Sequence, residues 1–191
     1  MKYIKYKEKD FIAYILINRP KKLNSLSSAV IDELINRVDY IQSNKKIRAV
    51  IITGAGNKAF IAGADINEMA KMNVDDASDY SHKGQLLTTK IENSRVPFIA
   101  AINGYALGGG CEIALACHIR YADQNAKFGQ PEVSLGLIAG FGGTQRLPRL
   151  IGKGRATELL LSGEIISSDK ALRYGLVNKI INNENTNEPA L

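Results

Sequence analysis

The sequence contains no tryptophan, only two histidines and two cysteines, and no apolar run long enough to cross a bilayer. The cysteines, Cys111 and Cys117, are too few for a disulfide framework or for a cysteine-based metal site. Residues 1–5 lack the apolar stretch and the small-residue cleavage site of a signal peptide. We therefore expect a cytoplasmic protein in a reducing compartment, and we expect no metal ion.

The chain also lacks a block of basic residues, although its formal net charge is +6. Lysine and arginine are scattered along the 191 residues, and no basic–aromatic motif of an RNA-binding module occurs. This scatter argues against nucleic acid or a membrane surface as the partner. A small ligand that carries several phosphates would use the same positive charge.

What the chain does contain is an alternation of short apolar runs and amphipathic segments. Apolar residues recur at helical spacing from Ser28 onward, and Ser27 or Ser28 is suited to cap that helix. This alternation predicts an α/β fold with a largely parallel sheet. The predicted strands cover residues 12–18, 49–53, 98–102, 119–122 and 176–180. The other predicted helices cover residues 78–93 and 111–117 and begin near residues 144, 155 and 168.

Two glycine-rich stretches suggest a ligand site. One is Ala62-Gly63-Ala64-Asp65, and the other runs from Asn103 to Glu112 with consecutive glycines at 108–110. Consecutive glycines let the backbone approach a ligand closely. A helix predicted to begin at these glycines leaves its first amides without internal partners, which suits an oxyanion hole. A tight turn is the simpler interpretation, but a turn needs fewer glycines.

A third glycine pattern points to a different ligand. Residues 54–59 read Gly-Ala-Gly-Asn-Lys-Ala, follow a predicted strand and fit the loose dinucleotide fingerprint, with Asp75 and Asp76 at about the expected distance downstream. That fingerprint requires a helix directly after the loop, and residues 60–64 are a poor helix start. Dinucleotide binding is therefore a minor alternative.

Two glutamates lie in apolar surroundings. Glu112 falls in the first turn of an otherwise apolar helix, and Glu132 falls among glycine and apolar residues at 128–133. A carboxyl in such surroundings keeps its proton to higher pH, which suits a general acid. Singly, each glutamate fits a helix terminus or a surface loop, but together with the glycine stretches they predict acid–base chemistry. Cys111 and His118 are expected to be structural.

Five motifs follow one another in a fixed order: Asn18-Arg19-Pro20, Lys58 to Ile66, Pro97 to Glu112, Phe128 to Glu132 and Gly142 to Leu147. Together they resemble the crotonase, or enoyl-CoA hydratase, superfamily from about residue 15 to residue 180. Within it, the sequence is most similar to bacterial short-chain enoyl-CoA hydratases, also called 3-hydroxybutyryl-CoA dehydratases. The resemblance implies a crotonase-like spiral of ββα units over residues 1–180, followed by a polar tail over residues 181–191.

The resemblance also implies an activity and a site. The amides of Ala64 and Gly109 would form the oxyanion hole for a thioester carbonyl. Glu112 as base and Glu132 as acid would add water to a trans-2-enoyl-CoA and give a 3-hydroxyacyl-CoA, a step of fatty acid metabolism. Coenzyme A is part of the substrate, so no separate cofactor is implied. Substrate or CoA contacts are implied for Lys21, Leu23, Lys58, Ala62, Asp65, Ile66, Asn67 and Gly108.

Other members of the superfamily leave two alternatives open. An enoyl-CoA isomerase needs one carboxylate with the same oxyanion hole, and a shortened member would bind acyl-CoA without turnover. The resemblance implies a helical C-terminal region that builds trimers or hexamers in this superfamily, but the strand predicted to end at Ile180 is followed here only by the polar tail. We therefore expect a naturally short or a truncated chain without that region. His118 replaces a usual Asp and Ala139 a common Pro, and we expect neither change to alter the chemistry.

Overall fold

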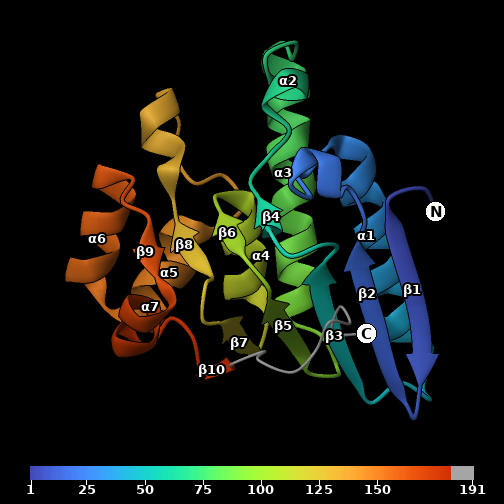
Figure 1. The fold of residues 1–191 in the computed structure, drawn as a ribbon. Helices are drawn as coiled ribbons and strands as arrows, with labels where there is room; N and C mark the ends of the chain where they lie inside the picture. Colours follow the sequence, from blue (N-terminus) through green and yellow to red (C-terminus); the bar gives the residue numbers. More distant parts are fainter. Residues whose placement is uncertain (182–191) are drawn as a thin grey trace.

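The larger of two sheets forms one side of the molecule (Figure 1). The structure is a computed structural model that describes residues 1–181. The six strands of this sheet lie in the order β1-β2-β3-β5-β7-β10, and every neighbouring pair except antiparallel β1 and β2 is parallel. The predicted α/β class with a largely parallel sheet is thereby confirmed. The strands are β1 (Ile4–Lys9), β2 (Ile12–Ile17), β3 (Ala49–Gly54), β5 (Phe98–Ile102), β7 (Ile119–Asp123) and β10 (Lys179–Ile181).

The second sheet has four short strands in the order β4-β6-β8-β9, of which β4, β6 and β8 are parallel. The chain passes from the large sheet to the small one three times, as β3 to β4, β5 to β6 and β7 to β8, and each passage is followed by a helix. This repetition is the predicted spiral of ββα units. The strands are β4 (Ala59–Ala62), β6 (Tyr105–Leu107), β8 (Lys127–Gly129) and β9 (Ile166–Ser167).

Helices begin where the sequence supplies a cap. Ser27 caps α1 by accepting the amide of Val30, and Asn73 forms a capping box with Asp76 at the start of α3. The helices are α1 (Ser28–Ser43), α2 (Ile66–Met69), α3 (Val74–Glu92), α4 (Gly109–Ala116), α5 (Gly143–Ile151), α6 (Lys153–Ser162) and α7 (Ser168–Tyr174). Two 3₁₀ helices, η1 (Pro20–Lys22) and η2 (Pro131–Leu135), each begin with a proline.

Helix α4 occupies the centre of the molecule (Figure 1). It packs against α3, α5, β4 and β6, and all eight of its residues are buried. A helix surrounded on every side is expected to be apolar throughout, and α4 is apolar except at Glu112. The fold therefore places one carboxyl, that of Glu112, in the apolar core, where charged side chains are rarely found without partners.

The structure corrects several sequence predictions. The dinucleotide alternative is wrong because residues 54–59 lead into strand β4, not into a helix. Helix α3 begins at Val74, four residues before the predicted start, because Asn73 supplies its cap. The last strand begins at Lys179 and not at residue 176, and Ile181 belongs to it and not to the predicted tail. The rest of that tail, residues 182–191, lies outside the described residues.

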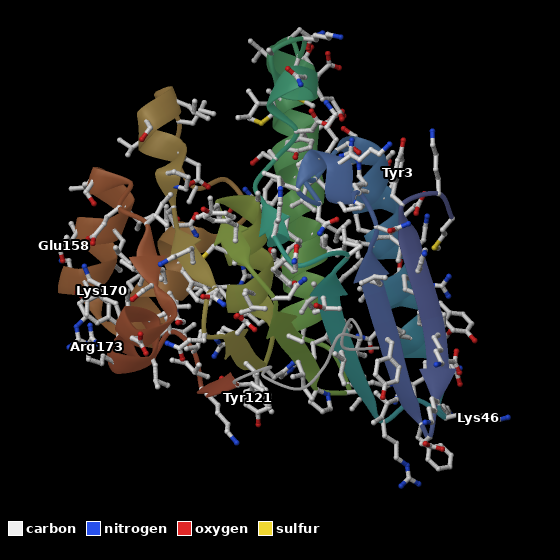
Figure 2. The ribbon with its side chains drawn as sticks, viewed as in Figure 1. Tyr3, Lys46, Tyr121, Glu158, Lys170 and Arg173 are labelled. Carbon is white, nitrogen blue, oxygen red and sulfur yellow. The ribbon has the colours of Figure 1, made fainter. Side chains whose placement is uncertain are left out.

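Among residues 1–181, no helix is both long and apolar enough to span a membrane. Charged side chains lie at opposite edges of the molecule, with Lys46 at one end and Glu158, Lys170 and Arg173 at the other (Figure 2). This distribution agrees with the scatter of charge along the sequence.

Candidate active site

The three parallel strands of the small sheet bring the predicted site residues together. The register aligns Ala62 of β4 with Leu107 of β6, and Leu107 with Gly129 of β8. Because the strands run in one direction and end level, the segments that continue from them emerge at one edge of the sheet. The two amides predicted for the oxyanion hole belong to the residues two positions beyond Ala62 and Leu107. Glu132 lies three positions beyond Gly129.

Both predicted oxyanion amides are free to bind a ligand. Among residues 1–181, neither the amide of Ala64 nor that of Gly109 donates a hydrogen bond to another residue. Gly109 is the first residue of α4, whose N-terminal amides and dipole favour negative charge. The Ala64 segment is held against Leu26, which donates to Gly63 at 2.9 Å and accepts from Asp65 at 2.7 Å. The two amides therefore lie on anchored backbone.

Two glycines are required at this edge for steric reasons. Gly108 has a φ of 50°, and a Cβ there would lie 3.0 Å from Oε1 of Glu132. A Cβ on Gly110 would lie 2.1 Å from the carbonyl oxygen of Ile61, because α4 packs directly on β4. The glycine triplet thus serves backbone conformation at its first position and close helix–strand packing at its last.

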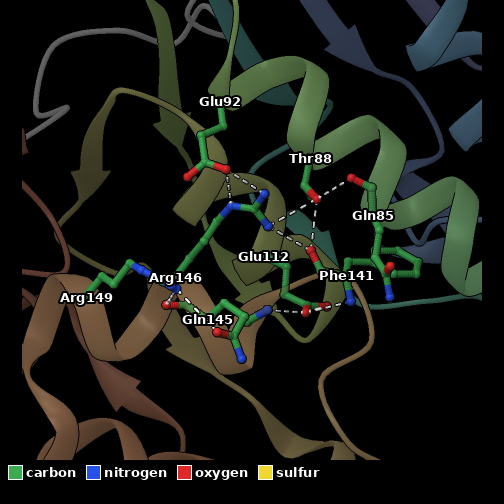
Figure 3. A network of polar contacts seen from close by, with 9 residues as sticks. Gln85, Thr88, Glu92, Glu112, Phe141, Gln145, Arg146 and Arg149 are labelled. Atoms are coloured by element: carbon green, nitrogen blue, oxygen red, sulfur yellow. Dashed lines mark hydrogen bonds and ion pairs between the residues drawn. The ribbon is translucent and has the colours of Figure 1, made fainter.

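Glu112 is held by one oxygen only (Figure 3). Its Oε1 accepts the amide of Phe141 at 2.8 Å and the amide of Gly143 at 2.7 Å. Among the described residues, no hydrogen bond reaches Oε2. The side chain is 1% exposed and lines the large cavity of the molecule. Oε2 is therefore the atom available to a ligand in the cavity.

Glu132 lies in η2 and lines the same cavity. In the amide orientation that satisfies both groups, buried Gln130 donates to Oε1 of Glu132 at 3.0 Å and to Oε2 at 3.2 Å. Pro131 starts this 3₁₀ turn and Gly136 ends it with a left-handed conformation. The turn directs the carboxyl toward the Gly108 edge of the sheet.

Both carboxyls hold their protons more tightly than ordinary glutamates. Burial raises the pKa of Glu112 to about 7, the amides of Gly143 and Phe141 oppose that rise, and the negative charge of Glu132 adds to it. Burial also raises the pKa of Glu132. With a pKa of about 7, Glu112 gains and loses its proton near neutral pH. A carboxyl that titrates there is suited to act as a base or as an acid.

The cavity has a volume of about 1160 Å³, which is large enough for a small organic ligand. Ala64, Gly109, Glu112 and Glu132 all line it, so the structure brings the four predicted chemical groups together. Its remaining wall is largely apolar. The apolar lining includes Ile66, Met69, Met72, Leu135, Leu137, Ile138, Ala139 and Phe141.

Of the eight residues expected to contact substrate or CoA, only Ile66 lines this cavity. Lys21 and Lys58 are exposed, and Asp65 pairs with Arg19 at 2.9 Å, so its carboxylate is already partnered. The carbonyl of Leu23 accepts the amide of Ala62. The predicted residues outside the cavity lining are Lys21, Leu23, Lys58, Ala62, Asp65, Asn67 and Gly108.

Other side chains have the structural roles expected of them. Nδ1 of His118 accepts the amide of Phe98 at 3.0 Å. Cys111 is buried in α4, and burial raises the pKa of its thiol. Residues 1–181 contain no group of three or more His, Cys, Asp or Glu side chains that would hold a metal ion.

Sequence reasoning missed the turn at residues 140–143, whose amides hold Glu112. It also missed Tyr80, whose ring packs 5.4 Å from that of Phe141 and lines the cavity. The only signal in the sequence was the motif Gly142 to Leu147. Nothing in that motif indicates that the backbone amides of Phe141 and Gly143 face a carboxyl.

Comparisons with known proteins agree with this geometry. The family model described as "Enoyl-CoA hydratase/isomerase" matches residues 7–191. The chain is 50% identical to a short-chain-enoyl-CoA hydratase of Clostridium acetobutylicum over 89% of this chain and 65% of that protein. It is 47% identical to a crotonyl-CoA hydratase of Syntrophomonas wolfei over 91% of this chain and 66% of that protein. A crystal structure of enoyl-CoA hydratase from Bacillus anthracis, 44% identical, superposes with a TM-score of 0.92 over 94% of this chain and 70% of that one.

The fold is a ββα spiral whose small sheet presents two free amides and two carboxyls to one cavity. The chain belongs to the enoyl-CoA hydratase/isomerase family. It spans slightly less than two thirds of the length of the two curated relatives described above.

Proposed function

We propose that this chain catalyses the reversible addition of water to a trans-2-enoyl-CoA to give a 3-hydroxyacyl-CoA. The observation that carries the proposal is that two carboxyls and two unpartnered amides line one cavity. The names of the relatives, short-chain-enoyl-CoA hydratase and crotonyl-CoA hydratase, support the same chemistry. A short acyl chain, as in crotonyl-CoA, is the proposed substrate.

The amides of Ala64 and Gly109 would receive the thioester oxygen. Addition of water at C3 places negative charge on that oxygen as an enolate forms. Two fixed amide donors stabilise such charge without reorganisation, and loss of one donor typically costs about 10²–10³ in rate. Gly109 adds the favourable end of the α4 dipole.

The two glutamates would divide the proton transfers. Glu112, whose Oε1 is held by two amides, uses its ionised Oε2 to take a proton from water as the water oxygen bonds to C3. Glu132 in its protonated form gives its proton to C2. Water is thereby added across the double bond, and the proton taken up by Glu112 balances the one that Glu132 loses.

An enoyl-CoA isomerase is the second candidate, because the family description includes isomerases and the amide pair would serve either reaction. Isomerisation needs one carboxyl, whereas Glu112 and Glu132 both line this cavity, and the third glutamate in its lining, Glu92, pairs with Arg146. The presence of both favours hydration. Product mass separates the reactions, since hydration adds one water and isomerisation leaves the mass unchanged. A chain that binds acyl-CoA without turnover would give neither product.

Other aspects of the function are also proposals. Contacts of the CoA moiety with Lys21 and Lys58 rest on the family likeness, and both lysines are exposed. Assembly into trimers or hexamers and a cytoplasmic location rest on the family likeness and on the sequence. Coenzyme A enters as part of the substrate, and the proposed reaction uses no further cofactor.

A hydration assay tests the proposal directly. Loss of the enoyl-thioester absorbance of crotonyl-CoA is followed for the wild type, for Glu132→Gln and for Glu158→Gln as a matched control. Glu158 is exposed on α6 at the outer edge of the molecule (Figure 2). We expect hydration by the wild type and the control, and a rate lower by about 10²–10⁴ in Glu132→Gln, the usual contribution of a positioned acid.

Binding measurements complete the test. Calorimetry with butyryl-CoA, which has no double bond to hydrate, should give similar affinity for wild type and Glu132→Gln. Hydration at the wild-type rate by Glu132→Gln would contradict the role of Glu132. A folded wild type that binds butyryl-CoA and leaves crotonyl-CoA unchanged would contradict the proposed activity.

A further inference from the structure

One face of α3 carries a row of four polar side chains, three of which contact the turn at residues 140–143. Ser81, Gln85, Thr88 and Glu92 are spaced by four, three and four residues, so they lie on one side of the helix. Gln85 donates to the carbonyl oxygen of Gly140 at 2.9 Å, and Ser81 donates to the same oxygen at 3.1 Å. Side chains of this row therefore hold, by hydrogen bonds, the backbone of a turn that packs over α4.

A side chain of α5, that of Arg146, also binds the backbone of this turn. Nη1 of Arg146 donates to the carbonyl oxygen of Phe141 at 3.0 Å, and Thr88 donates to that oxygen at 2.9 Å. Nε and Nη2 of Arg146 donate to Glu92 at 3.1 Å and 2.7 Å, which fixes the guanidinium (Figure 3). The Arg146 side chain is 11% exposed, so its position is set by these partners.

The hydrogen bonds to the carbonyls of Gly140 and Phe141 also set the direction of the amides of Phe141 and Gly143. The carbonyl of Gly140 and the amide of Phe141 belong to one planar trans peptide unit, so fixing the carbonyl fixes the direction of the N–H. That N–H donates to Oε1 of Glu112 at 2.8 Å. Fixing the carbonyl of Phe141 similarly constrains the next peptide units, which lead to the amide of Gly143.

We propose that Gln85, Thr88 and Arg146 are positioning residues that aim the amides of Phe141 and Gly143 at Glu112 and so hold its carboxylate for catalysis. The inference rests on the proposed function for its kinetic consequence only. None of the three side chains needs to touch the reacting atoms. Their effect reaches the reaction through the backbone of the turn.

The consequence for pH dependence has a definite sign. Hydrogen bonds from amides favour the ionised form of Glu112, so misaimed amides raise its pKa further. If Glu112 acts as the base, the acidic limb of kcat/KM moves to higher pH. Loss of one hydrogen bond to a charged group corresponds to about one pKa unit, or about tenfold at a fixed pH on that limb. The titratable or charged groups that interact with Glu112 are Glu132 from η2, Arg146 from α5, Tyr80 from α3, and Cys111 from α4 itself. Glu92 of α3 pairs with Arg146.

The test compares three variants with a matched control. Gln85→Leu removes a neutral donor, so it changes no charge, and its exposed position preserves the fold. Arg146→Lys keeps the positive charge and loses the planar set of donors. Arg146→Met removes both. The control is Lys90→Met, which breaks the Lys90–Asp39 ion pair of α3 and leaves the turn untouched.

Two readouts are measured for each protein: the pH profile of crotonyl-CoA hydration, and the titration of the Glu112 carboxyl by ¹³C NMR, assigned with Glu112→Gln. We expect Gln85→Leu and Arg146→Lys to shift the pH profile and the Glu112 titration toward higher pH by about one unit, with KM little changed and the control unaffected.

Two outcomes would overturn the inference. One is a wild-type titration of Glu112 in both Gln85→Leu and Arg146→Lys, even if their melting temperatures fall. A purely electrostatic role of Arg146 would shift Arg146→Met alone, which also overturns it. If the wild type fails to hydrate crotonyl-CoA, the NMR titration still decides the positioning role separately from the proposed activity.

Discussion

Gly84 offers the sharpest test of how the core supports the site. It lies inside α3, where glycine is normally a weak choice and alanine stabilises by about 0.5–1 kcal/mol. In this protein, however, the ring of Phe141 packs directly over Gly84. A Cβ on residue 84 would lie 2.1 Å from Cδ1, 2.2 Å from Cε1 and 2.4 Å from Cγ of that ring. We therefore predict that Gly84→Ala reverses the usual sign and destabilises the protein.

The magnitude follows from how far the ring must move. Ordinary contact begins at 3.4 Å, so the nearest ring atom, now at 2.1 Å, must recede by about 1.3 Å. Phe141 is 5% exposed, and because it lines the cavity, its ring can recede in part into that space. Overpacking of this kind costs about 1–3 kcal/mol, and the helix gain offsets part of it. The expected net loss is about 1–2 kcal/mol.

Activity should fall by a larger factor than stability suggests. The amide of Phe141 is 2.8 Å from Oε1 of Glu112, and a displacement of about an ångström takes it beyond hydrogen-bond distance. Misplacement on that scale costs up to about 10²-fold in rate. We expect Gly84→Ala to lower kcat for crotonyl-CoA by about 10–100-fold with a smaller change in KM.

The control for Gly84→Ala is Gly154→Ala in α6. A Cβ on Gly154 would meet nothing within 4 Å, so this substitution should be neutral or stabilise by up to about 1 kcal/mol. Urea denaturation gives both free energies of unfolding, and the crotonyl-CoA assay gives both rates. A Gly84→Ala protein that is at least as stable as Gly154→Ala and fully active would refute the reasoning.

Two further predictions concern the carboxyls. Gly108→Ala should lower kcat about tenfold or more with butyryl-CoA binding retained, because its Cβ, at a φ of 50°, would lie 3.0 Å from Oε1 of Glu132; unchanged kcat would count against this contact. The pKa of Glu112 rises on folding from 4.5 to about 7, so its protonation stabilises the fold fully below about pH 4.5, and that stabilisation is lost as pH rises through 7. Glu112→Gln should therefore gain up to about 3 kcal/mol over wild type between pH 4.5 and pH 8 in urea titrations, and a pH-independent difference would contradict the assignment.

An element of the fold was predictable when the residues that determine it are close together in the sequence. Helix α1 carries a serine cap and a regular apolar face, and its predicted start agrees with the structure. Strands β4, β6 and β8 have only three or four residues and pair with partners far along the chain. Runs that short, beside glycines, are not distinguishable from turns by periodicity. The alternating α/β order was therefore predictable, but the second sheet was not derivable from pattern and came only with the family resemblance.

The site divides in the same way. Glu112 was recognisable because a charged residue in an apolar helix is unusual, whatever the fold. Glu132 had a weaker signal, a carboxyl among glycine and apolar residues, and its proximity to the glycine triplet arises only from the pairing of β6 with β8. The amides of Phe141 and Gly143 had no signal beyond the motif Gly142 to Leu147, because every residue except proline carries a backbone amide.

Glu112 shows why that missing information matters for mechanism. Burial alone would leave the carboxyl neutral and unable to act as a base near pH 7. The two amides on Oε1 oppose burial by stabilising the charged form, and they do so without occupying Oε2. A side-chain partner such as lysine would lower the pKa further, but it would also compete with water for the second oxygen. Backbone donors from a turn held by α3 and α5 avoid that competition, so the residues that tune the proposed base are found on neighbouring helices and not around the reacting atoms.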